Sequence, residues 1–151
     1  MQPSKPTQIL NLNDFLPLDG EDRIEIFHNG GALSLDIFYE PKGHESRTAK
    51  LRIHFPYAKY FFKTLFPDNG FYGCLLNLDS SLDAQGSPGD DQDLSCLHSL
   101  IEYQHSKLLD MDHKTTGATG YKEYQLLLHS VGVAIHVIAD SCEISNEELV
   151  D

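Results

Sequence analysis

The sequence lacks tryptophan and has only three cysteines, Cys74, Cys96 and Cys142. An odd number of cysteines at wide spacing argues against a disulfide framework and favours reduced thiols in a cytosolic compartment. No apolar run approaches the roughly 20 residues that cross a bilayer. The first residues show no compact apolar stretch before a cleavage site, so a secretory signal is not expected. These absences predict a cytoplasmic chain that does not enter a membrane.

Basic residues are also absent from two long stretches of the chain, residues 64–106 and 123–151. Acidic residues continue through both stretches, and the formal net charge of the chain is −12. A surface this negative repels nucleic acid phosphates and anionic lipid, and it attracts cations or basic proteins. We therefore expect no nucleic acid partner and favour a basic protein as the partner.

Two β-hairpins are predicted from strict alternation of apolar and polar residues. In the first, residues 23–28 and 33–39 are joined by Asn29-Gly30-Gly31, which tolerate the positive φ that a tight turn requires. In the second, residues 124–128 and 133–139 alternate in the same way. A third strand is expected over residues 48–55, and its outward-pointing side chains are Lys50, Arg52 and His54.

The middle of the chain is less uniform. Residues 57–66 fit a short helix by their spacing, and they fit a strand equally well because their aromatics favour both structures. Residues 71–78 are expected to form another strand. The apolar residues of 94–108 suit an amphipathic helix that begins near Asp91 or Asp93 and ends before Asp110.

These elements together predict a single α+β domain over residues 1–151. Its sheet is mostly antiparallel, with about five to six strands built from the two hairpins, and one or two helices cover one face. Residues 1–12 are expected to be a loose lead-in, residues 79–93 an acidic loop and residues 141–151 an acidic tail.

The densest group of metal-ligating residue types lies within residues 98–113. His98 and His105 are seven residues apart, so on a helix they lie two turns from each other, unlike the i, i+4 pair of a zinc helix. This spacing favours a solvated helix face over a metal site. The remaining members of the group are Asp110, Asp112 and His113.

Signatures of catalysis are also missing. There is no Gly-x-Ser-x-Gly nucleophile elbow and no phosphate-binding glycine loop. Outside the 98–113 group, His54, His129 and His136 are expected to be exposed on sheet faces. We assign no catalytic residue, cofactor or metal, and we keep a metal-dependent or acid–base enzyme using residues 98–113 as an alternative function.

Eight of the 15 aromatic residues fall within residues 55–72, and six basic residues lie in or just before this segment. Such interleaving can bind single-stranded nucleic acid, but the net charge opposes it here. Most of these aromatics are expected to build the core. Exposed tyrosines anchor interfaces well, so we assign Tyr57 and Tyr60 to partner binding. A second alternative function is a structural subunit that forms a homodimer through residues 55–72.

The other residues assigned to partner binding are acids of the 79–93 loop. They miss the alternate spacing and central glycine of an EF-hand, so calcium is not expected. Complementary charge would speed the encounter with a basic partner. The chain is therefore predicted to be an acidic protein-binding module. The five loop positions are Asp79, Asp83, Asp90, Asp91 and Asp93.

The C-terminal hairpin, Tyr124-Gln-Leu-Leu-Leu-His-Ser-Val-Gly-Val-Ala-Ile-His-Val-Ile-Ala-Asp followed by Ser-Cys-Glu-Ile, resembles the ends of some compact bacterial toxin-immunity proteins. The resemblance covers about the last fifth of the chain and includes no residue diagnostic of function. It implies a cytosolic inhibitor that caps a toxin's active site, often that of a nuclease with a basic substrate groove.

Overall fold

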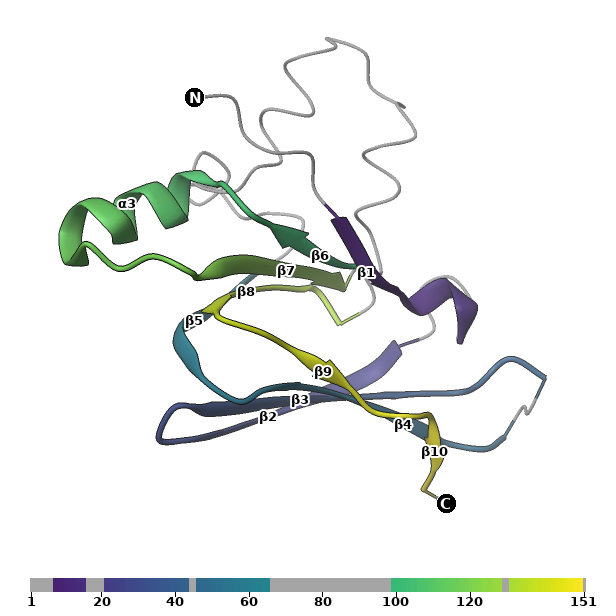
Figure 1. The fold of residues 1–151 in the computed structure, drawn as a ribbon. Coiled ribbons are helices and arrows are strands. Elements are labelled where there is room, and N and C mark those ends of the chain that lie inside the picture. The colour runs from purple at the N-terminus through teal and green to yellow at the C-terminus, as the bar shows by residue number, and fades with distance from the viewer. Residues whose placement is uncertain (1–6, 16–20, 44–45, 66–98, 129–130, 151) are drawn as a thin grey trace, which may run out of the picture.

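The computed structural model describes residues 7–15, 21–43, 46–65, 99–128 and 131–150. Its strands form two five-stranded sheets (Figure 1), and all of their pairings are antiparallel. Sheet A has the order β1-β6-β7-β8-β5, and its strands are β1 (Thr7–Asn11), β5 (Ala58–Leu65), β6 (Ser99–Tyr103), β7 (Lys122–Leu128) and β8 (Val133–Ala139). Sheet B has the order β10-β4-β3-β2 with β9 also paired to β4, and its strands are β2 (Glu21–Asn29), β3 (Ala32–Tyr39), β4 (Ala49–Phe55), β9 (Glu143–Ile144) and β10 (Glu148–Leu149).

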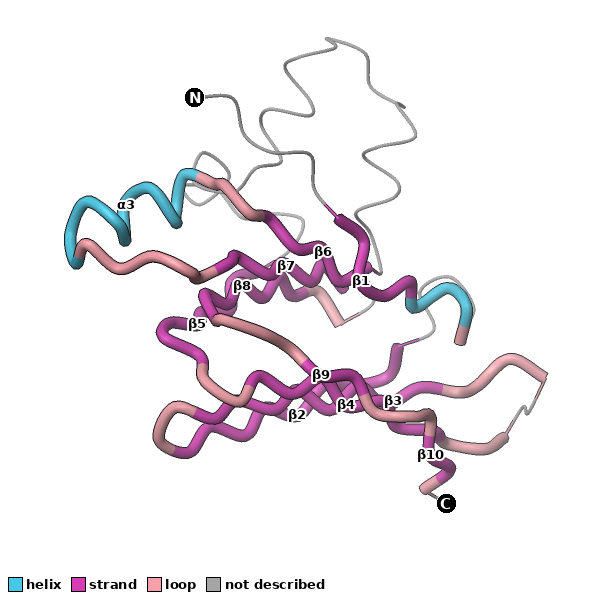
Figure 2. The backbone as a smooth tube through the Cα atoms, in the orientation of Figure 1, coloured by secondary structure: helices cyan, strands magenta, loops and turns pink. Residues whose placement is uncertain are grey.

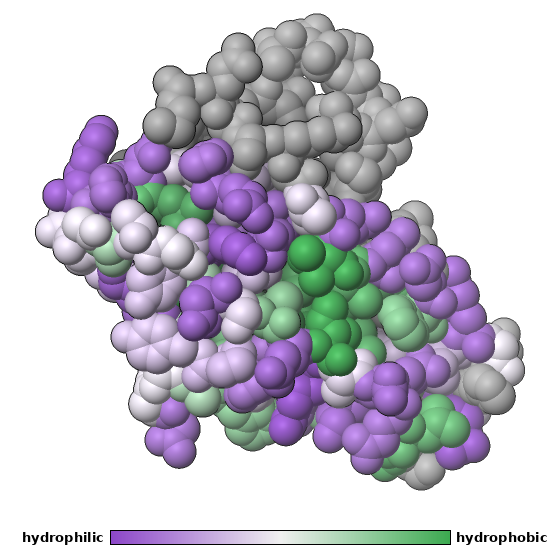
Figure 3. All heavy atoms as spheres, in the orientation of Figure 1, coloured by the Kyte–Doolittle hydropathy of each residue, from purple (hydrophilic) through white to green (hydrophobic). Residues whose placement is uncertain are grey.

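The two sheets face each other as two layers and share one hydrophobic core. Each sheet contributes alternate residues, as a pleated strand with one buried face requires. The core residues of β4 include Leu51, Ile53 and Phe55, all fully buried, which confirms the predicted inward face of this strand. On the side of the molecule seen in Figure 3, polar side chains surround an apolar patch at the middle.

Both predicted hairpins are present. β2 and β3 pair from Asn29↔Ala32 outward, and Gly30 at the turn has a φ of +62°, a conformation that costs glycine little. β7 and β8 pair from Leu128↔Val133 outward. The α+β class and the antiparallel pairing are confirmed, whereas the ten described strands exceed the five to six expected and divide between two sheets.

Residues 57–66 form a strand rather than a helix over their described part, because β5 pairs along most of its length with β8. The chain crosses from sheet B to sheet A at Pro56 and Tyr57. The N–H of Ala58 then donates to the carbonyl of Gly31 at 2.6 Å, which ties the crossover to the first hairpin. Pairing across the sheet thus decides between two structures that the aromatic spacing allowed equally.

The helix predicted from near Asp91 or Asp93 to before Asp110 is wrong over residues 99–103, and residues 91–98 lie outside the described residues. Residues 99–103 form β6, whose apolar residues are buried on both faces of the sheet. A strand buried on both faces has no alternation of apolar and polar residues, so its apolar positions also fit the spacing of a helix. The α-helix, α3, spans Lys107–Thr116. Ser106 caps it by accepting a hydrogen bond from the N–H of Leu109 at 3.1 Å, and Gly117 ends it in the left-handed conformation.

The sequence predicted that one or two helices cover one face of the sheet. α3 does not cover the core-facing side of either sheet. Within the described residues, each sheet is covered on that side by the other sheet. α3 lies at one end of the molecule, where it contacts β7 (Figure 2). Neither described helix, α3 nor the 3-10 helix Leu12–Asp14, has the length and apolarity needed to span a bilayer.

The two ends of the chain are ordered more than expected. Residues 7–11 of the predicted loose lead-in form β1, which pairs with β6. Within the predicted acidic tail of residues 141–151, β9 and β10 pair with β4. Between and beyond them, Ser145 and Val150 donate backbone hydrogen bonds to the carbonyls of Arg52 and Thr48, both at 2.9 Å. Backbone groups along a sheet edge need partners, and both terminal segments supply them.

Candidate protein-interaction site

Of the seven residues predicted to bind a partner, the structure describes two, Tyr57 and Tyr60. The five aspartates of the 79–93 loop lie outside the described residues, as do the predicted strand 71–78 and His98. Tyr57 and Tyr60 are each 48% exposed, and their role in partner binding stays a prediction.

A third tyrosine joins them from a different part of the chain. The rings of Tyr57 and Tyr121 have centroids 6.4 Å apart and are tilted by 40°. The ammonium of Lys59 lies 5.0 Å from the ring centroid of Tyr121 and 5.7 Å from that of Tyr60. We call Tyr57, Tyr60 and Tyr121 the tyrosine cluster. Sequence reasoning missed Tyr121, because only the packing of the β6–β7 connection against β5 brings it here.

Lys59 also connects the tyrosine cluster to α3. Its Nζ donates to Oδ2 of Asp112 at 2.9 Å and to Oγ1 of Thr116 at 3.0 Å. The hydrogen bond to Asp112 raises the pKa of Lys59 above its ordinary value, so the side chain stays charged. These contacts fix the last turns of α3 beside the start of β5 and restrict the neighbouring tyrosines.

The ring of Tyr57 packs against the backbone of Gly31, a residue without a side chain. A Cβ at Gly31 would lie 2.5 Å from Cδ2 of the Tyr57 ring, closer than real Cβ contacts come. Gly31 therefore allows the ring to pack directly on the first hairpin. This contact gives Tyr57 a defined position while half of its surface stays exposed.

The alternative His/Asp group of residues 98–113 is dispersed in its described part. His105, Asp110 and His113 are exposed, and Nδ1 of His113 lies 3.2 Å from the carbonyl of Ala118. Asp112 is buried and pairs with Lys59. Among the described residues, no group of three or more His, Cys, Asp or Glu side chains is placed to hold a metal ion.

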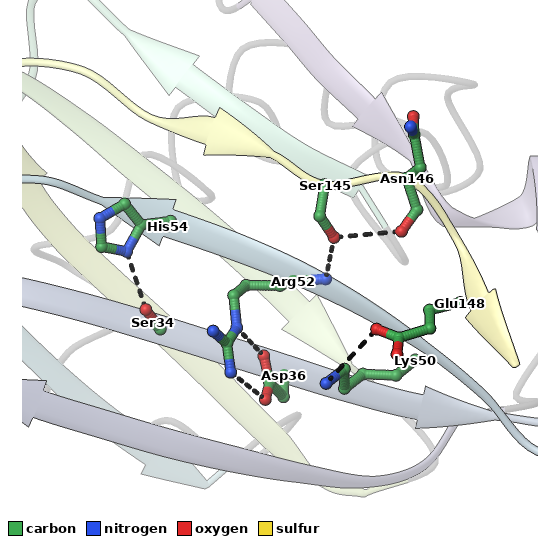
Figure 4. Close-up of polar contacts among 8 residues, drawn as sticks. All are labelled: Ser34, Asp36, Lys50, Arg52, His54, Ser145, Asn146 and Glu148. Carbon is green, nitrogen blue, oxygen red and sulfur yellow. Dashed lines mark hydrogen bonds and ion pairs between the residues drawn. The ribbon is translucent and has the colours of Figure 1, made fainter. Parts of the chain in front are cut away.

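The outward residues of β4 take part in an ordered set of polar contacts on sheet B, shown in Figure 4. Arg52 donates to both carboxylate oxygens of Asp36, at 2.6 and 2.8 Å, and this bonding raises the pKa of Arg52. Nδ1 of His54 lies 2.8 Å from Oγ of Ser34. Lys50 lies 3.7 Å from Glu148 of β10. The outward orientation of Lys50, Arg52 and His54 is confirmed, and each of them has a polar partner on sheet B.

The opposite outer face, on sheet A, holds polar residues that sequence reasoning did not place. Glu123, Gln125 and His136 are 0–1% exposed, so His136 is not the exposed histidine expected. Nδ1 of His136 lies 3.3 Å from Oε2 of Glu123, and the Phe62 ring stacks on the imidazole with centroids 5.1 Å apart. The available signal was Leu127, an apolar residue on the same face as Gln125.

Comparison of the chain with models of protein families, with curated proteins and with solved structures finds no match. The resemblance of the C-terminal hairpin to toxin-immunity proteins therefore stays a prediction.

Proposed function

We propose that this chain is an acidic protein-binding module whose partner is a basic protein. The observation that carries the proposal is the pair of half-exposed tyrosines, Tyr57 and Tyr60, held in place on a chain of net charge −12. Tyrosine is enriched among the residues that dominate binding energy at interfaces, and the charge selects partners of opposite sign.

The support beneath the tyrosines favours binding. Tyr57 packs on Gly31, and Lys59 joins Tyr60 and Tyr121 to Asp112 of α3. Side chains ordered before binding lose less conformational entropy when the complex forms. The acids at residues 79–93 would act at longer range by speeding the encounter.

A narrower form of the proposal is an immunity-type inhibitor in the cytoplasm that neutralises a basic toxin, such as a nuclease. Its support is the resemblance of the C-terminal hairpin. A protein that caps a nuclease must compete with nucleic acid for a basic groove, and an acidic surface suits that role.

The homodimer alternative would use the same tyrosines against a second copy. The net charge of −12 opposes self-association. Sedimentation over a wide concentration range separates the two: a constant mass near 17.0 kDa removes the homodimer.

The test has two stages. The chain is first used to capture proteins from lysate of its own cell, and captured proteins are identified by mass spectrometry. Association of the purified partner is then measured at low and high salt for the native chain, for a Tyr57→Ala/Tyr60→Ala double variant and for Phe27→Ala. Phe27 is a matched control because it is 50% exposed on sheet B.

We expect a basic partner, association that slows as salt rises, and roughly tenfold or greater weakening by the double variant, as loss of interface anchors produces. Phe27→Ala should bind like the native chain. A neutral or acidic partner, or equal affinity of the double variant, would contradict the proposal.

A further inference from the structure

We infer that the tyrosine cluster receives an arginine side chain of the partner. The inference rests on the proposed function and specifies the chemistry that Tyr57 and Tyr60 recognise. It starts from the position of Lys59, a cation of the chain itself that lies beside two of the three rings.

The rings already accept a positive charge. Lys59 Nζ lies 5.0 Å from the ring centroid of Tyr121 and 5.7 Å from that of Tyr60, both within the range of attraction between a cation and an aromatic face. Tyr57 lies next to Tyr121, and 48% of its surface is exposed. This exposed surface is where a partner's cation would meet the cluster.

The charge of Lys59 does not exclude a second cation. Its ammonium bonds Oδ2 of Asp112, whose side chain is only 4% exposed, so the pair is close to neutral as a unit. Oδ1 of Asp112 is buried and accepts no hydrogen bond within the described part. This oxygen contributes negative potential beside Lys59, which itself lies near the rings of Tyr60 and Tyr121.

Arginine suits these rings better than lysine. A guanidinium is flat and weakly hydrated, so it stacks on an aromatic face, whereas an ammonium is compact and strongly hydrated. The chain contains one such stack: the guanidinium of Arg23 lies over the ring of Phe38, 3.9 Å from its centroid. Arg52, whose Nε and Nη2 donate to Asp36, lies farther from a ring, 5.8 Å from the centroid of Phe27.

The test compares two synthetic peptides of equal length and charge, a Gly/Ser peptide with four arginines and the same peptide with four lysines. Affinity is measured by NMR titration of the full chain with labelled tyrosine rings. We expect the arginine peptide to bind about 3–10 times more tightly, as stacking of a guanidinium on exposed rings predicts, and to shift the ring signals of Tyr57 and Tyr60.

Variants then locate the preference. Tyr60→Phe keeps the ring and should keep the preference, whereas Tyr57→Ala and Tyr60→Leu should reduce the ratio toward one. Phe27→Ala should leave it unchanged. Thermal melts of each variant check that folding is intact.

Equal affinity for the two peptides, or ring signals that shift equally with both, overturns the inference. If the Tyr57→Ala/Tyr60→Ala variant still loses the natural partner in that case, the proposed function stands and only the arginine is wrong. If neither peptide binds and the double variant keeps its partner, both proposals fail.

Discussion

The outer faces of the two sheets carry similar polar residues in opposite surroundings. On sheet B, Arg52 and Asp36 form a two-pronged ion pair, and the arginine side chain is 43% exposed. On sheet A, Glu123 and His136 form a contact in which both side chains are at most 1% exposed. A basic side chain and a carboxylate thus meet at a half-exposed position on one sheet and at a fully buried position on the other.

The difference teaches where polar residues are costly. Exposed ion pairs contribute about 0–1 kcal/mol to stability, because water screens the charges and because ordering two long side chains costs conformational entropy. A buried polar atom without a partner costs about 1–3 kcal/mol. Within the described part of sheet A, Nε2 of His136 and both amide atoms of Gln125 are buried and make no hydrogen bond. Four predictions compare the two sheets, from the largest expected effect to the smallest.

The largest effect is expected from His136→Ala. It removes a buried ring that contacts Glu123 and on which Phe62 stacks, so the free energy of unfolding should fall by about 3–5 kcal/mol. Urea denaturation measures the change. The matched control is His54→Ala on sheet B, which should cost about 1 kcal/mol or less. Equal losses for the two variants would remove the contrast between the faces.

Alkaline pH should destabilise the protein because the core-facing side of each sheet carries a buried tyrosine. Burial raises the pKa of Tyr39 on sheet B and of Tyr124 on sheet A well above the ordinary value of 10.0. Above pH 10 the unfolded chain releases these protons while the folded chain keeps them. The stability present below pH 10 is therefore lost as pH rises, by up to about 1.4 kcal/mol per pH unit for each tyrosine.

Single variants separate the contributions of the two tyrosines to the fall in unfolding free energy above pH 10. Tyr39→Phe and Tyr124→Phe should each lower it by about half, whereas Tyr60→Phe, at an exposed position, should not change it. Unfolding free energies measured between pH 8 and 11 provide the slope. A slope that neither core variant changes would contradict the prediction.

A smaller effect of opposite sign is expected from Gln125→Leu. Gln125 is fully buried, and neither of its amide atoms makes a hydrogen bond among the described residues, so an apolar side chain of similar size removes a desolvation penalty. We expect a gain of about 1–2 kcal/mol in the free energy of unfolding, measured by thermal and urea denaturation. A loss of stability would show that the amide makes interactions that the apolar side chain does not replace.

The smallest effect is expected from Lys50→Met on sheet B. Lys50 lies 3.7 Å from Glu148, whose side chain is 65% exposed, so the pair should contribute no more than about 0.5 kcal/mol. The measurement is the shift in urea midpoint with and without 0.5 M salt. A loss above 1 kcal/mol would mean that this pair holds β10 on β4.

Much of the fold could be predicted from local patterns, and the failures have physical causes. The Asn29-Gly30-Gly31 turn and the inward Leu51, Ile53 and Phe55 were predicted, because strand alternation and turn chemistry are local. Residues 99–103 were predicted as helix, because a strand buried on both faces loses its alternation. The short strands at the two ends could not be predicted, because a two-residue ladder such as β9 depends on the edge of β4.

The candidate site likewise has one part that the sequence predicted and one part that only the fold brings together. Tyr57 and Tyr60 were chosen from the sequence because they are tyrosines in an aromatic-rich segment and exposed tyrosines anchor interfaces well. Their support from Gly31, Lys59 and Asp112 joins three distant parts of the chain, which no local pattern contains.

By itself, the sequence determined the net charge, the absence of a catalytic signature and the two hairpins, because these depend on composition and on neighbours along the chain. Only the tertiary structure decided which polar residues face water. Tyr57 and Tyr60 remain exposed where the chain crosses between sheets, while Gln125 and His136 are buried. Burial is a property of packing between distant segments, and it gives the same residue types opposite energetic roles.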